Sequence, residues 1–118
     1  MKIALTTREK SLESELDLRF ARGNYILFYN TDDDTYKFID NQADDAHGAC
    51  PKMIEFLVRN ETNAIIARSL GKNAYDAANS AGIKIYENKD EKAIKNIDLL
   101  KNNKLKEMNS FSNGHKWF

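Results

Sequence analysis

A histidine and a cysteine three positions apart, His47 and Cys50, are the residues of this sequence best suited to bind a metal. A neutral imidazole can ligate a metal ion where thiolates are scarce. Gly48, next to the histidine, lets the backbone approach a ligand closely. If a helix has begun by Cys50, the cysteine can reach the same ligand, and helix N-termini lower the pKa of thiols. Both side chains are therefore candidate metal ligands.

Each of these residues also has a plainer interpretation. A loop histidine can simply hydrogen-bond its loop to a neighbouring strand, and a lone cysteine is more often a small buried hydrophobic residue. Because Cys50 is the only cysteine, one chain can form neither a disulfide nor a four-cysteine metal site. A bound cluster would need other ligands or a second subunit. His115 could complete such a site, although a histidine near a terminus is usually solvated.

The elements that must position these residues alternate between strand and helix patterns. Pro51 suits the first turn of a helix, Asn73 is the expected N-cap of a second helix, and Gly82 is the expected left-handed end of that helix. Apolar or alternating runs predict strands at residues 2–6, 25–29, 35–40, 64–67 and 83–86, and helical spacing predicts helices at 51–60, 73–81 and 93–102. The order is β-β-β-α-β-α-β-α, which indicates an α/β fold.

The segment after the first strand has a less regular pattern. Thr6 and Glu9 have the spacing of a capping box, and Leu12 with Leu16 could face inward on one helical turn. We interpret residues 7–24 as a mobile flap.

Size and composition exclude several classes of function. The 118 residues fit one domain, expected over residues 1–106, and residues 107–118 are expected to form a flexible tail in spite of three aromatic side chains. Eighteen basic residues balance eighteen acidic ones, so no overall field favours nucleic acid. No apolar stretch approaches the ~20 residues that span a bilayer, and the start MKIALTT lacks a signal-peptide core. We expect a cytoplasmic protein that binds neither nucleic acid nor membrane.

Four blocks of the sequence, MKIAL, LRFARGNYILFY, AHGA and GKNAYDAANSAGIKIYE, resemble in this order the dinitrogenase iron-molybdenum cofactor biosynthesis family. The resemblance spans about residues 1–106. It implies a ribonuclease-H-like single domain, in which a five-stranded mixed sheet is flanked by about three helices. The second strand would be antiparallel, and the first would lie centrally beside the fourth. Relatives include carriers and insertases of the iron-molybdenum cofactor and a protein that binds a molybdenum-copper-sulfur cluster, so the resemblance implies a nitrogen-fixation-related cofactor carrier.

The implied topology predicts where the site lies. Strands one, three, four and five would run the same way and deliver their following loops to one edge of the sheet. Residues 6–8, 44–50 and 68–73 would converge there, and two helix N-termini would offer free N–H groups to an anion. The expected cofactor-binding residues at this edge are Arg8, Gly48, Arg68, Gly71, Lys72 and Asn73, beside the metal ligands His47 and Cys50.

His47 lies in the AHG block, so the resemblance favours its interpretation as a ligand. Cys50 is an addition to the family motif. The sequence Ala67-Arg68-Ser69 replaces a glycine-rich stretch that is usual in relatives. Side chains at these positions would narrow the pocket and alter which cofactor fits.

Two further arginines, Arg19 and Arg22, bracket Phe20 in a block that resembles the family's R-F-G-R-A. Here Ala21 and Gly23 replace the usual glycine-alanine order. Arg22 is a candidate cofactor-binding residue that would clamp an anion. Alternatively, both arginines are solvated charges beside a strand.

The sequence gives little support for a catalytic site. Nucleases of this fold need carboxylates beginning on the first strand, and residues 2–6 offer none. The aspartates at 32–34 lack the spacing and the glycine of a calcium loop, and they suit a hairpin turn. There is no phosphate-loop signature, and a Cys50–His47 nucleophilic pair has no identified orienting acid. We expect a protein that is not an enzyme.

The expected function is a binding or carrier protein for an anionic metal-sulfur cofactor, either an iron-sulfur cluster or a molybdenum-containing one like the iron-molybdenum cofactor. A metalloprotein acceptor would be its partner, and the chain would be a monomer or a weak homodimer. The alternative is a metal-free protein-interaction or regulatory domain of the same fold. A redox thiol protein or a hydrolase is a third interpretation.

Overall fold

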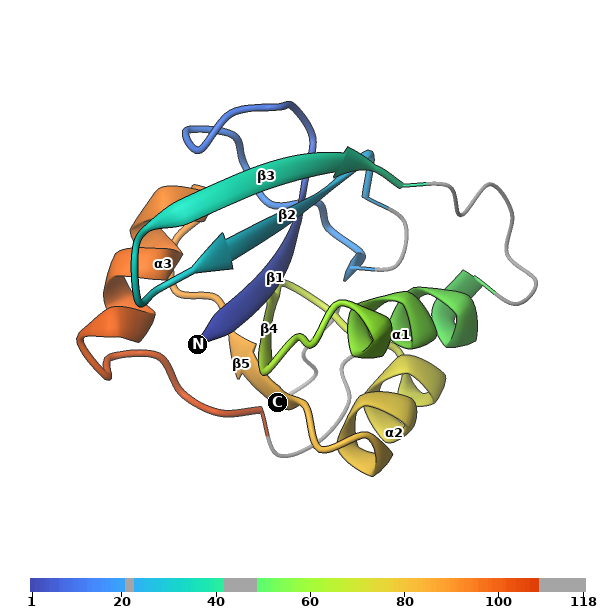
Figure 1. The fold of residues 1–118 in the computed structure, drawn as a ribbon. Coiled ribbons are helices and arrows are strands. Elements are labelled where there is room, and N and C mark those ends of the chain that lie inside the picture. Colours follow the sequence, from blue (N-terminus) through green and yellow to red (C-terminus); the bar gives the residue numbers. More distant parts are fainter. Residues whose placement is uncertain (21–22, 42–48, 109–118) are drawn as a thin grey trace, which may run out of the picture.

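The computed structural model describes residues 1–20, 23–41 and 49–108, which form a single α/β domain (Figure 1). The sheet has the order β3-β2-β1-β4-β5, with β2 antiparallel to both neighbours and β4 parallel to β1 and β5. The strands are β1 (Lys2–Thr7), β2 (Tyr25–Asn30), β3 (Thr35–Asp40), β4 (Ala64–Ala67) and β5 (Lys84–Glu87), and the helices are α1 (Ala49–Arg59), α2 (Lys72–Ser80) and α3 (Ala93–Lys101). The predicted ribonuclease-H-like mixed sheet with three helices is confirmed.

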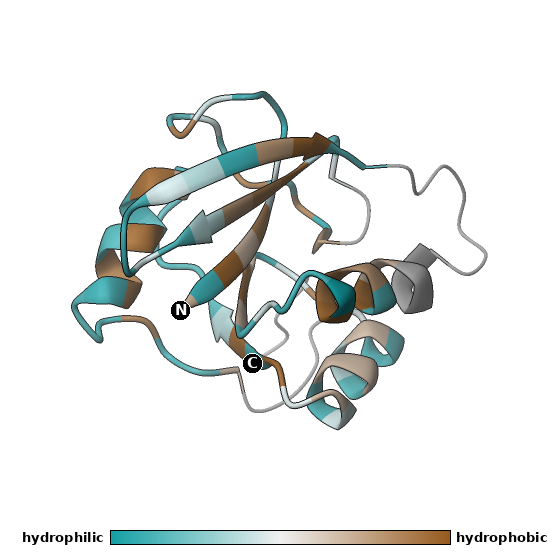
Figure 2. Cartoon of the chain, viewed as in Figure 1, coloured by the Kyte–Doolittle hydropathy of each residue, from teal (hydrophilic) through white to brown (hydrophobic). Residues whose placement is uncertain are grey.

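The sheet separates two apolar layers. Along β1, Ile3 and Leu5 pack on the face covered by α3, whereas Ala4 packs on the face covered by α1 and α2. The same alternation continues in β2 and β4, so these strands are buried almost throughout. The edge strand β3 is mostly exposed. Figure 2 accordingly shows hydrophobic colour along the central strands and paler or hydrophilic colour over much of β3.

The start of α2 differs from the expected one. Asn73 was the predicted N-cap, and this prediction is wrong, because the helix begins at Lys72 after an extended Gly71 (φ −67°, ψ 165°). Leu70 and Ala74, on either side of this start, are both buried, so packing against the core fixes the chain here and outweighs the capping preference of asparagine. At the other end, Gly82 has φ 78°, which confirms the predicted left-handed stop.

Residues 8–20 together with 23–24, here called the rim segment, form irregular structure. The helical turn predicted for Leu12 and Leu16 is wrong: Leu16 pairs with Thr7 in an isolated antiparallel bridge. Leu16 packs in the α3 layer and Phe20 in the α1–α2 layer, each about 1% exposed. The segment therefore crosses the edge of the sheet and is anchored on both faces.

The chain after α3 covers the outer edge of β5. Leu105 packs in the α3 layer and Met108 in the α1–α2 layer, while Glu107 forms an antiparallel bridge with Tyr86. Residues 109–118 lie outside the described residues, so the tail boundary at 107 stays a prediction. Within the described ranges, no helix is long and apolar enough to cross a membrane.

Candidate functional site

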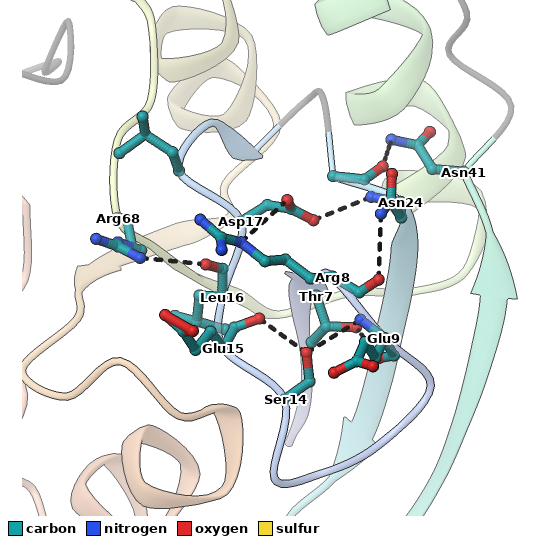
Figure 3. Close-up of polar contacts among 12 residues, drawn as sticks. Thr7, Arg8, Glu9, Ser14, Glu15, Leu16, Asp17, Asn24, Asn41 and Arg68 are labelled. Atoms are coloured by element: carbon teal, nitrogen blue, oxygen red, sulfur yellow. Dashed lines mark hydrogen bonds and ion pairs between the residues drawn. The ribbon is translucent and has the colours of Figure 1, made fainter.

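The C-terminal ends of β1, β3, β4 and β5 lie at one edge of the sheet, here called the rim, because these four strands run the same way. Arg8 follows β1 and Arg68 follows β4. Both approach the rim segment at consecutive residues: Arg68 Nη1 lies 3.4 Å from the carbonyl oxygen of Leu16, and Arg8 Nε lies 4.0 Å from Oδ1 of Asp17 (Figure 3). The structure therefore brings two of the predicted cationic residues to one place.

Arg8 has a carboxylate partner that is itself held in position. Asp17 is only 18% exposed, and its Oδ2 accepts a hydrogen bond from the backbone N–H of Asn24 at 3.0 Å. The side chain of Asn24 in turn donates to the carbonyl oxygen of Arg8 at 3.1 Å. Half-exposed Arg8 therefore faces a carboxylate before any ligand arrives, and this carboxylate reduces its net attraction for an anion.

Arg68 has a different environment. Its guanidinium donates to one backbone carbonyl and, within the part of the chain that the structure describes, has no carboxylate within 4.0 Å. The side chain is partly buried, so its charge is less screened than that of a fully exposed arginine. A guanidinium has five N–H donors, so four remain for an anionic ligand when one is used. Arg68 is the strongest anion-binding candidate at the rim.

The start of α2, at Lys72, lies four residues after Arg68. The helix has no side-chain cap, so its first backbone N–H groups are not satisfied by a side chain. A Cβ added to Gly71 would meet nothing within 4 Å, so the N-cap position is not crowded. Lys72 is largely balanced by Asp76, whose Oδ2 lies 2.7 Å from its Nζ, and Asn73 is exposed. The helix start thus offers donors to an anion, whereas the lysine adds little.

The remaining predicted site residues cannot be placed in the same way. Arg22, His47 and Gly48 lie outside the described residues. Cys50 belongs to the first turn of α1, which confirms that a helix has begun there. Among the described residues, no group of three His, Cys, Asp or Glu side chains could hold a metal ion.

Asn96 is a residue that sequence reasoning missed. It is completely buried in α3, where its Oδ1 accepts from the N–H groups of Lys89 and Asp90 and its Nδ2 donates to the carbonyls of Asp90 and Lys92. These bonds shape the loop after β5, whose Glu91 carbonyl accepts from Leu16 N–H at 2.8 Å. Asn96 thus indirectly positions the rim segment. An asparagine within the apolar row Ala93, Ile97 and Leu100 was the available signal.

A ribonuclease-H-like α/β domain with cations and an uncapped helix start at the rim defines the class of this protein. The chain belongs to the dinitrogenase iron-molybdenum cofactor family, whose sequence profile matches residues 1–103. This confirms the family resemblance. A search of curated proteins gives no significant match.

Three solved structures show the likeness at the level of the fold. A NifB-like protein from Thermotoga, assigned to the DUF35 family, is 31% identical with a TM-score of 0.83, over 94% of this chain and 96% of its own. The apo orange protein from Desulfovibrio gigas is 19% identical with a TM-score of 0.87, over 94% and 95% of the two chains. A dinitrogenase-like protein from Methanocaldococcus jannaschii is 23% identical with a TM-score of 0.71, over 93% and 96%.

Proposed function

We propose that this protein binds and carries an anionic metal-sulfur cofactor at the rim and delivers it to a metalloprotein acceptor in the cytoplasm, without catalysing a reaction. Family membership supports a cofactor-related carrier role. The observation that carries the proposal is Arg68, a partly buried guanidinium without a carboxylate partner among the described residues, beside the uncapped start of α2.

These donors suit an anionic cluster treated as cargo. Sulfido and oxo groups carry the negative charge of such a cluster. The guanidinium of Arg68 and the backbone N–H groups of α2 would donate hydrogen bonds to them. Metal ligation would come from His47 and Cys50, which lie outside the residues whose side chains the structure describes. Donor contacts of this kind hold a cluster reversibly, as a carrier must.

The balance of charges at the rim makes the proposal specific. Arg8 already faces Asp17, and Lys72 already faces Asp76, so removing either cation costs little net attraction for an anion. Removing Arg68 costs a charge-assisted hydrogen bond, which is worth about 1.5–3 kcal/mol. Arg68 therefore sets most of the electrostatic affinity in the part of the rim that is described.

The test uses tetrathiomolybdate, a compact metal-sulfur anion, added without oxygen to the purified protein and followed by its visible absorption. Arg68→Gln should weaken binding by about tenfold or more, because about 1.4 kcal/mol corresponds to a factor of ten. Arg59→Gln, at the far end of α1, is the matched control and should bind as the wild type does. His47→Ala tests metal ligation separately. Equal affinity in wild type and Arg68→Gln contradicts the site, and protein that ignores every cluster favours the metal-free interaction domain.

A further inference from the structure

An open groove of about 610 Å³ lies between the C-terminal halves of α1 and α2, away from the rim. Its floor and walls are mainly apolar, and Val58 is 47% exposed although it is a large hydrophobic residue. Exposed apolar hollows of this kind mark interaction surfaces. The groove is lined by Ile54, Glu55, Val58 and Arg59 of α1 and by Ala77, Ser80 and Ala81 at the end of α2.

The chain leaves the described structure in the direction of this groove. The N–H of Glu87 donates to the carbonyl of Lys106, and the N–H of Met108 donates to the carbonyl of Ile85 at 2.7 Å. Residues 106–108 therefore run antiparallel along β5, toward the strand's start and the end of α2. The side chain of Met108 packs in the α1–α2 layer. In Figure 1 this last described stretch, which follows α3, reaches β5 and passes beside it.

We propose that the C-terminal segment 109–118 folds back around the end of α2 and docks aromatic side chains in the α1–α2 groove. The segment has the sequence NSFSNGHKWF, so its only large apolar residues are Phe111, Trp117 and Phe118. Ten residues can span roughly 33 Å when extended. That reach is close to the longest dimension of the molecule, 34 Å, so the groove is accessible from Met108.

The chain's own segment is a better occupant than a second molecule for two reasons. A tethered segment presents itself at an effective concentration of about millimolar, which favours it over a free partner for a shallow groove. The segment also starts next to the groove, because residues 106–108 run along β5 toward the end of α2, where Ala81 lines the groove. The proposal concerns a surface remote from the rim and does not depend on which cofactor binds there.

The only tryptophan of the chain lies in the docking segment, so its fluorescence reports on docking directly. In the full-length protein, Trp117 emission should be shifted to shorter wavelength than that of free tryptophan and protected from acrylamide quenching. Val58→Asp should shift the emission to longer wavelength and remove the protection, because it puts a charge into the apolar groove. Ala81→Glu, at an exposed position on the opposite wall, should do the same.

Leu18→Asp is the matched control, since Leu18 is 53% exposed but lies on the rim segment. It should leave the emission unchanged, and circular dichroism should show that all variants are folded. Wild-type emission already typical of exposed tryptophan overturns the proposal, as does wild-type fluorescence in both groove variants. Protection that disappears on dilution by about a hundredfold also overturns it, because the segment would then dock on a second copy of the chain.

Discussion

At Gly23 the rim segment runs against β1 so closely that no side chain fits. A Cβ built there would lie 2.4 Å from the Cβ of Thr6 and 2.7 Å from Oδ2 of Asp17. The carboxylate of Asp17 also pairs with Arg8, so the backbone at Gly23 lies next to this ion pair. Glycine at this position lets the segment pass between the strand and the carboxylate.

Gly23→Ala should therefore lower the free energy of unfolding by about 1–3 kcal/mol, because overpacking a contact with a strand forces backbone shifts. Gly71→Ala is the matched control: its added Cβ meets nothing within 4 Å, and its φ of −67° suits any residue. The control should change the free energy of unfolding by less than about 1 kcal/mol, because the lower entropy of the unfolded chain and the weaker N-cap preference of alanine oppose each other. Urea denaturation measures both, and equal stability of the two variants would contradict the close contact.

Single residues at the rim were only partly predictable from sequence. The family block and the parallel strands were sufficient to bring Arg8 and Arg68 to one edge. The partners of these arginines could not be predicted, because Asp17 and the carbonyl of Leu16 belong to a segment without periodicity. The departure of Gly23 from the family's order has its reason in a contact with β1, which no local pattern reveals.

Between elements, one cluster joins the β2–β3 turn to the end of α3. Oδ1 of Asp34 accepts from the hydroxyl of Tyr29 at 2.8 Å and from Nζ of Lys101 at 2.7 Å. The hydrogen bond with Lys101, followed by that with Tyr29, lowers the pKa of Asp34 below its ordinary 3.8. The same hydrogen bond raises the pKa of Lys101. The cluster lies at the end of the sheet opposite to the rim.

The direction in which stability changes with pH follows from the lowered pKa of Asp34. Because the pKa of Asp34 is lower in the folded state, its contribution to stability is full above the ordinary pKa of 3.8 and is lost as pH falls through the folded value. Asp34→Asn removes the charge but suits the left-handed backbone at this position, φ 58°. The variant should be less stable than wild type near neutral pH, and the difference should shrink below about pH 4.

Thermal unfolding at a series of pH values measures this difference. Asp76→Asn is the control, because its pair with Lys72 lies on the surface of one helix and joins no separate elements. It should change the melting temperature little at any pH. A stability difference for Asp34→Asn that persists undiminished at low pH would contradict the role of the carboxylate.

The helices and strands were predicted well where burial of one or both faces gives the sequence a regular pattern of apolar residues. The strands and helices have nearly the expected bounds because their apolar rows determine which side faces the sheet. The rim segment differs, because Leu12 and Leu16 have helical spacing but their own backbone groups bond to distant residues. Ile94 N–H donates to the carbonyl of Leu12, and Leu16 N–H donates to that of Glu91. Long-range hydrogen bonds outweighed a weak local preference.

At the scale of the whole molecule, one sheet supports two apolar layers that share every central strand. Leu57 of α1 and Ile97 of α3 are both fully buried, on opposite faces. The rim segment, with Leu16 in one layer and Phe20 in the other, links the layers outside the sheet. Neither layer can lose its packing without exposing the strands that the other layer covers.

Leu57→Ala and Ile97→Ala should therefore each lower the free energy of unfolding by about 2–5 kcal/mol, the usual cost of a large-to-small change in a core. Both should do so within one cooperative transition whose dependence on urea is unchanged. Far- and near-ultraviolet circular dichroism follow helices and aromatic packing in the same samples, and Lys95→Ala, exposed on α3, is the control. Two separate transitions in either core variant would show that the layers unfold independently, and the shared sheet would then not couple them.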